Sequence, residues 1–153
     1  MLGEAALTHA DAEKYLKDYS DAIAALVDDK YKGKSPKPTI SIKLSALHPH
    51  YETAREEQVL AELSETVLKL IRQARLGDVG ITIDAEEADR LELSLKLFKK
   101  IYQHPDVKGW GNFGLVVQAY SKRALPVLCW LTLLAKQQGD LIPVRLVKGA
   151  YWD

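Results

Sequence analysis

The chain has 153 residues, of which 47% are hydrophobic and 27% are charged, a composition typical of a folded globular domain. Its 21 basic and 21 acidic side chains cancel, so the sequence argues against nucleic-acid binding by this segment. A single cysteine, Cys129, excludes an internal disulfide; it lies in an apolar helical segment, where we expect a buried, inert thiol.

The sequence carries no pattern that directs it into or across a membrane. Met1 is not followed by a basic segment and a long apolar run, so no signal peptide is expected. The most apolar stretch, 124–135, is too short to span a bilayer of about 30 Å. These features, with the single cysteine, fit a protein of the cytoplasm.

The first half of the chain predicts one helix, one strand and a second helix. Hydrophobic residues recur at helical spacing over 10–27, and Thr8 with Asp11 resembles the capping box that opens a helix. The pattern then predicts a loop over 30–38, a strand over 39–44, a second loop over 45–51 and a helix over 56–75.

The second half repeats the strand and helix pattern and ends on a fourth strand. The pattern predicts strands over 81–84, 113–118 and 144–147, helices over 88–102 and 123–138, and a loop over 104–112. Short apolar strands that alternate with amphipathic helices predict a parallel sheet. No Gly-x-Gly-x-x-Gly motif follows a strand, so an α/β fold of the (β/α)8 TIM-barrel type is favoured over a Rossmann fold. Four strands are half of such a barrel, so we expect residues 1–153 to form one partial barrel domain, about strands 2–5 with their helices, which is unstable alone.

Four polar residues stand at the carboxyl ends of the predicted strands, namely Lys43, Asp84, Gln118 and Arg145. In parallel α/β folds these ends meet at one edge, where ligands bind. Lys43 is either a solvent-reaching lysine or one that binds a carboxylate or forms a Schiff base. Asp84 fits a helix N-cap as well as an active-site acid. Arg145 lies in a strand that we expect to be covered on both sides, so its guanidinium needs a partner, either Asp84 or a ligand.

A turn follows the last strand at Lys148 and Gly149, residue types that suit an anionic cofactor at a strand end. Glu86 and Glu87 fit the positive end of the next helix. The histidines show no ligand-like spacing, and no metal site is assigned. Residue pattern alone predicts a barrel enzyme with a site of mixed charge.

Four segments, in this order, resemble the proline dehydrogenase domain of the bacterial bifunctional proline utilization A family. They are TISIKLSALHP at 39–49, ITIDAEE at 81–87, VVQAY at 116–120 and VRLVKGAYWD at 144–153. The resemblance implies a (β/α)8 barrel that uses FAD to oxidise L-proline to Δ1-pyrroline-5-carboxylate, the first step of proline catabolism to glutamate. It also implies electron transfer to a membrane quinone, with peripheral membrane contact, and an aldehyde dehydrogenase domain downstream.

Roles for individual residues follow from the resemblance. Lys43 would bind the proline carboxylate, and Asp84 and Arg145 would be active-site residues, with Arg145 also close to the flavin. The residues that would contact FAD are Ala85, Gln118, Arg145, Lys148, Gly149 and Ala150. Glu4 is a candidate partner for a cation from a further part of the barrel. The family also uses a tyrosine and two arginines from the last part of the barrel, beyond Asp153, so we expect little activity from these 153 residues alone.

Two other functions remain open at this point. A Schiff-base aldolase on the same barrel would use Lys43 or Lys148 as its nucleophile. A truncated interaction module is the alternative without catalysis, but the presence of Lys43, Asp84 and Arg145 favours an enzyme.

Overall fold

A computed structural model describes residues 2–28 and 37–149 of the chain. Helices and strands alternate, and the two 3-10 turns are labelled η. In chain order the elements are α1 (His9–Val27), β1 (Thr39–Ile42), α2 (Leu44–Leu47), η1 (Thr53–Arg55), α3 (Glu56–Leu76), β2 (Gly80–Ile83), η2 (Ala88–Arg90), α4 (Leu91–Tyr102), β3 (Phe113–Gln118), α5 (Ala124–Gln138) and β4 (Val144–Val147).

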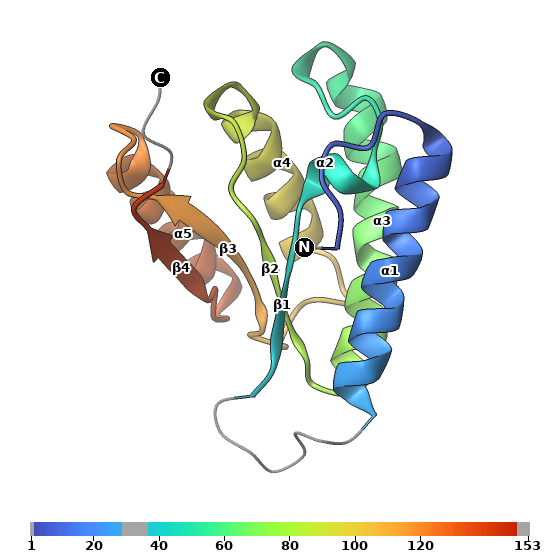
Figure 1. Cartoon of the computed structure of the whole chain (residues 1–153). Coiled ribbons are helices and arrows are strands. Elements are labelled where there is room, and N and C mark those ends of the chain that lie inside the picture. Colours follow the sequence, from blue (N-terminus) through green and yellow to red (C-terminus); the bar gives the residue numbers. More distant parts are fainter. Residues whose placement is uncertain (1, 29–36, 150–153) are drawn as a thin grey trace.

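The strands form one parallel sheet in the order β1-β2-β3-β4 (Figure 1). Each strand is joined to the next by a connection that contains a helix, as parallel pairing requires. All four carboxyl ends therefore lie at the same edge of the sheet. This arrangement confirms the predicted parallel α/β fold.

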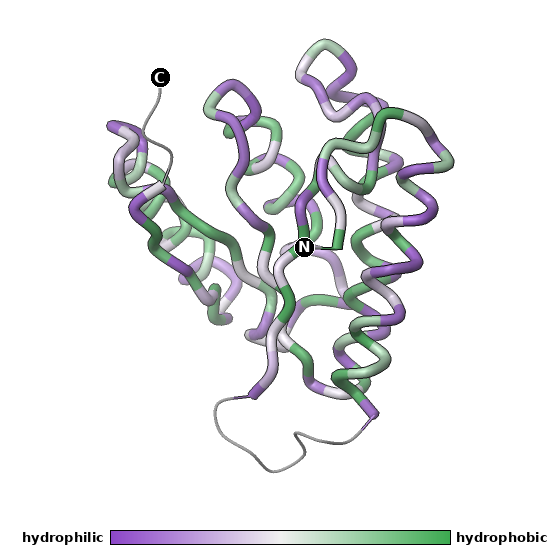
Figure 2. Tube along the Cα trace, in the orientation of Figure 1, coloured by the Kyte–Doolittle hydropathy of each residue, from purple (hydrophilic) through white to green (hydrophobic). Residues whose placement is uncertain are grey.

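The hydrophobic core lies between the sheet and the helices, and α3 provides much of it. Val59, Leu63, Val67 and Ile71 recur every fourth residue along one side of α3 and have no exposed surface. Figure 2 shows β3 as a mostly hydrophobic strand, whereas the loop between β2 and α4 is mostly hydrophilic. The apolar strands thus anchor the sheet and leave polar residues at its carboxyl edge.

The capping box predicted for α1 is confirmed. The Asp11 amide donates to the Thr8 hydroxyl at 3.1 Å, and the Thr8 amide donates to the Asp11 carboxylate at 2.9 Å. These bonds fix the start of α1 and the course of the preceding segment.

Three local predictions are wrong. The segment after β1 begins with the short helix α2 instead of a loop. Cys129 is exposed, not buried. The prediction failed because α5 is apolar on most of its surface, so its sequence pattern does not identify which side is buried. Strand β4 is not covered on both sides: it lies at the edge of the described sheet, where Val144 and Leu146 are exposed.

Within the described residues, no helix combines the length and the apolar character needed to cross a membrane.

Candidate functional site

The register of the sheet places three of the predicted site residues on one row. Ile42 pairs with Ile83, and the next residues, Lys43 and Asp84, extend that pairing beyond the strand ends. On the other side of β2, Ile83 pairs with Leu115 of β3, so the next residue, Asp84, lies opposite Val116. Val116 in turn pairs with Arg145 of β4. Side chains on one row of a sheet point to the same face. Lys43, Asp84 and Arg145 therefore share a face at the carboxyl edge.

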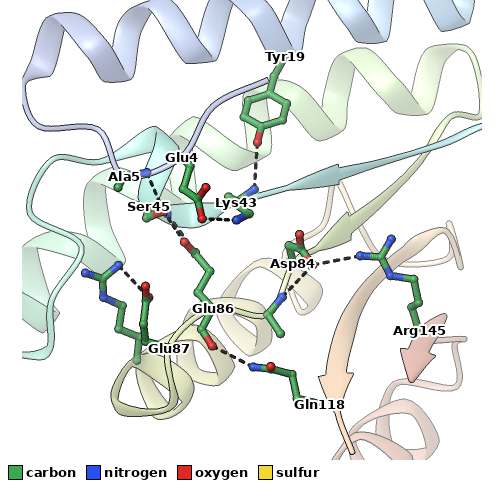
Figure 3. Close-up of polar contacts among 12 residues, drawn as sticks. Glu4, Ala5, Tyr19, Lys43, Ser45, Asp84, Glu86, Glu87, Gln118 and Arg145 are labelled. Carbon is green, nitrogen blue, oxygen red and sulfur yellow. Dashed lines mark hydrogen bonds and ion pairs between the residues drawn. The ribbon is translucent and has the colours of Figure 1, made fainter. Parts of the chain in front are cut away.

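Asp84 and Arg145 are in contact. They lie two strands apart, about 10 Å between main chains, and the long arginine side chain reaches across Val116. Its Nη2 donates to Asp84 Oδ1 at 3.0 Å, and the same oxygen accepts the Ala85 amide at 3.1 Å (Figure 3). Of the two partners expected for Arg145, Asp84 or a ligand, the structure shows Asp84, and the Arg145 side chain is 52% exposed and not buried.

Asp84 is not the N-cap of the helix that follows. The caps of η2 and α4 are Glu87 and Arg90, and the Asp84 carboxylate instead bonds the adjacent amide and Arg145. Asp84 therefore lies outside the helical turns that follow and is directed to the site.

Lys43 is held from two sides. Its main-chain amide donates to the phenol oxygen of Tyr19, from α1, at 3.1 Å, and its ammonium forms an ion pair with Glu4 (Figure 3). Within the described residues, Lys43 is therefore the partner of Glu4, and a pairing of Glu4 with a cation from a further part of the barrel stays a prediction. Burial lowers the pKa of the Lys43 ammonium, but the hydrogen bond and charge of Glu4, with Glu86 and Asp84 nearby, outweigh it and raise the pKa. Lys43 is therefore a cation at neutral pH.

Glu86 is not merely an acid at a helix terminus. Its carboxylate accepts hydrogen bonds from the amide and the hydroxyl of Ser45, from α2. Burial raises the pKa of Glu86, an effect that the hydrogen bonds of Ser45 partly offset. The Glu86 carbonyl accepts from Gln118 Nε2 at 3.0 Å, so the loop after β2 is tied to α2 on one side and to β3 on the other.

The turn at Lys148 and Gly149, which the sequence assigned to the cofactor, lies beside the end of β3. Gly149 has a φ of 92°, and a Cβ there would approach Tyr120 and Gln118 side-chain atoms to 2.6 and 2.7 Å. The Lys148 carbonyl accepts the Tyr120 amide at 3.0 Å. The Lys148–Gly149 turn therefore packs closely on Gln118, and Ala150 lies outside the described residues.

Sequence reasoning overlooked three residues that shape this site. Tyr19, Ser45 and Glu86 contribute through hydrogen bonds between segments far apart in the chain. A serine two residues after Lys43 was visible in the sequence, but its partners were not.

Comparison with known proteins identifies the family. The family model described as Proline dehydrogenase matches residues 1–153. The chain belongs to the proline dehydrogenase family. It is 49% identical over 154 residues to the bifunctional protein PutA of Salmonella typhimurium and to that of Escherichia coli, alignments that cover 100% of this chain. Proline dehydrogenase 1 of Bacillus subtilis is 28% identical over 151 residues, which cover 98% of this chain and 42% of that protein.

Solved structures of this family share the fold. A variant of proline utilization A from Bradyrhizobium japonicum superposes with a TM-score of 0.94 at 46% identity, over 99% of this chain and 16% of that one. Proline utilization A of Bdellovibrio bacteriovorus, inactivated by N-propargylglycine, gives 0.91 at 28% identity, over 98% of this chain and 17% of that one. The (β/α)-barrel class predicted from the sequence is confirmed. The chain spans 12% of the length of the curated PutA relatives that it matches.

Proposed function

We propose that this chain contributes the substrate-binding edge of a flavoenzyme that oxidises L-proline to Δ1-pyrroline-5-carboxylate. The observation that carries the proposal is the row of Lys43, Asp84 and Arg145 in a chain of the proline dehydrogenase family. We assign residues 1–153 to one partial barrel domain.

Lys43 is the residue that binds the proline carboxylate. Its ammonium is charged, its side chain is 22% exposed, and its position after β1 directs it to the ligand edge of the sheet. A charged lysine forms strong, charge-assisted hydrogen bonds with a carboxylate. Tyr19 fixes the main chain of Lys43 and Glu4 restricts the positions that the ammonium adopts, so less entropy is lost when substrate binds.

The residues on the Arg145 side fit an anionic cofactor such as FAD. Arg145 is half exposed, and a guanidinium carries five N–H donors, of which Asp84 engages one in the described contacts. The close turn at Gly149 sets Lys148 beside Gln118 at the same edge. Ala85, Gln118, Arg145, Lys148 and Gly149, with Ala150, would hold the flavin, which when bound supplies the acceptor for the hydride.

The division of charge follows from these contacts. Asp84 holds the Arg145 guanidinium above the sheet at 3.0 Å, which keeps one cation on the cofactor side of the row. Lys43 keeps a second cation on the substrate side. Cations at this edge would favour a bound cofactor that gains negative charge when it accepts the hydride.

The test is the visible spectrum of the protein produced from its complete natural gene. Flavin bands that bleach on anaerobic addition of L-proline support the proposal. A matched Lys43→Met variant should keep the flavin bands but need at least tenfold more proline for half-maximal bleaching. A colourless protein that FAD does not reconstitute, or flavin that proline leaves oxidised, would contradict it.

A Schiff-base aldolase is less well supported. A nucleophilic lysine needs a lowered pKa, and the pKa of Lys43 is raised. Trapping of a carbonyl substrate on Lys43 or Lys148 by borohydride would bring this alternative forward. An interaction module without catalysis does not account for site residues that meet on one face.

The proposal extends to the rest of the reaction. We further propose that electrons pass to a membrane quinone and that the natural protein is a cytoplasmic protein in peripheral contact with the membrane. The curated PutA relatives are named as bifunctional, which supports an aldehyde dehydrogenase domain downstream of this segment.

A further inference from the structure

Ser45 connects three segments of the site. Its hydroxyl accepts the Ala5 amide at 3.1 Å, and its carbonyl accepts the Ala6 amide at 2.8 Å. On the other side its hydroxyl and amide both donate to the carboxylate of Glu86 (Figure 3). Ser45 is 3% exposed, so water competes weakly for these bonds.

The segment that Ser45 holds has an unusual backbone. Ala5 has a φ of 47°, in the left-handed region that residues other than glycine adopt only when their surroundings impose it. The bonds from the Ala5 and Ala6 amides to Ser45 supply that constraint. The residue immediately before the turn is Glu4, whose carboxylate pairs with Lys43.

Ser45 therefore lies close to both partners of the ion pair and bonds directly to the turn that carries one of them. Lys43 lies two residues before Ser45 in the chain, and Glu4 is fixed through the Ala5 turn. A lysine ammonium carries three donors on a flexible stem. When Glu4 takes one donor in a fixed direction, the other two are directed consistently toward a ligand.

We propose that Ser45 is a positioning residue, whose hydroxyl holds the turn at Ala5 so that Glu4 orients the Lys43 ammonium for the substrate carboxylate. This inference rests on the proposed function. Ser45 acts through Glu4 and Lys43 and does not itself touch the substrate.

The test uses the holoenzyme from the complete natural gene and the variant Ser45→Ala. Ser64→Ala is the matched control, because Ser64 is equally buried at 3% exposed and bonds only a carbonyl of its own helix, that of Ala61, in the described contacts. We expect Ser45→Ala to raise KM for L-proline at least fivefold with kcat within twofold, and Ser64→Ala to change neither. In a Glu4→Gln background, adding Ser45→Ala should change KM by less than twofold, because the residue through which it acts has already been altered.

A second measurement does not depend on activity. Amide hydrogen exchange of residues 2–7 should become at least tenfold faster in Ser45→Ala and stay unchanged in Ser64→Ala. Unchanged exchange, a fall in kcat with KM unaltered, or an equal rise of KM in both Glu4 backgrounds would overturn the inference. If the unsubstituted enzyme does not oxidise proline, the proposed function fails, and a normal exchange rate in Ser45→Ala would still separately refute the role of Ser45.

Discussion

Gly114 in β3 is the position at which the packing of the sheet is least tolerant of a side chain. A Cβ added there would lie 2.0 Å from the carbonyl oxygen of Pro143, a main-chain atom just before β4. Ordinary contacts begin near 3.4 Å, so Gly114→Ala requires β4 to move away from β3 by about 1.4 Å. The same carbonyl accepts the Leu115 amide at 3.1 Å, and this hydrogen bond is lost when the strands separate.

The size of the effect follows from the cost of overpacking a closely packed site, about 1–3 kcal/mol. Since about 1.4 kcal/mol is a factor of ten, exchange of the Leu115 amide should accelerate about 5- to 150-fold. Because β4 carries Arg145, its contact with Asp84 should also be lost, and proline turnover should fall at least tenfold.

The assay is hydrogen exchange of peptides that cover 113–118 in the protein from the complete gene, with Gly80→Ala as the control. A Cβ on Gly80 would meet a Thr39 methyl at 3.0 Å and the Asn112 carbonyl at 3.4 Å, contacts that small shifts relieve. We expect less than a threefold change for the control. Equal protection of Leu115 in Gly114→Ala and in the unsubstituted protein would refute the reasoning.

Three further substitutions test other parts of the structure. Tyr19→Phe removes the acceptor of the Lys43 amide and should lower the free energy of unfolding by about 1–3 kcal/mol, measured by urea denaturation; an unchanged midpoint would contradict the importance of this bond. Burial raises the pKa of Glu86 above its ordinary 4.5, so the folded protein binds more protons than the unfolded chain just above that pH, and stability falls as pH rises from 4.5 to the folded pKa. In Glu86→Gln, the midpoint temperature of thermal unfolding should no longer fall over this pH range. Plots of midpoint temperature against pH that run parallel for the two proteins would count against this prediction. Asp78 adopts a φ of 55° and accepts the Trp110 indole N–H at 3.2 Å; Asp78→Ala should shift the Trp110 fluorescence, while an identical spectrum would show that the bond is not maintained.

The sequence predicts most elements because each has a local pattern. The bounds of β3 and β4 agree with the structure, since each is a short apolar run followed by a turn. Helices α1 and α3 differ from prediction by one residue at an end, because one face is hydrophobic and residues at the ends mark where each helix begins or stops.

Burial of α5 and β4 was not predictable in the same way. Both are apolar, which indicates a core position, yet Leu125, Leu133 and Leu146 are exposed in the described structure. Apolar composition records that a residue suits a covered position but does not identify which neighbour covers it. Cys129 was misjudged for this reason.

The site was only partly predictable from the positions of its residues. The pattern predicts that Lys43, Asp84 and Arg145 end or occupy three strands of one sheet, but their common row depends on a register that the sequence does not display. The bonds of Ser45 to Glu86 and to Ala5 join residues 41 and 40 positions apart. Such contacts become visible only when the strands are aligned in space.

The two cations of the row differ in the contacts that hold them. Lys43 is bonded at its main chain by Tyr19 and at its ammonium by Glu4, and its side chain is 22% exposed. Arg145 lies on the last strand of the described sheet and is held at its guanidinium by Asp84 in the described contacts. Fixed geometry suits recognition of a small substrate, because a displaced carboxylate loses its hydrogen bonds. A guanidinium suits a larger anion, because it carries five N–H donors and Asp84 engages one of them in the described contacts. Substitutions around Lys43 should therefore act mainly on substrate binding, whereas those around Arg145 should act mainly on the cofactor.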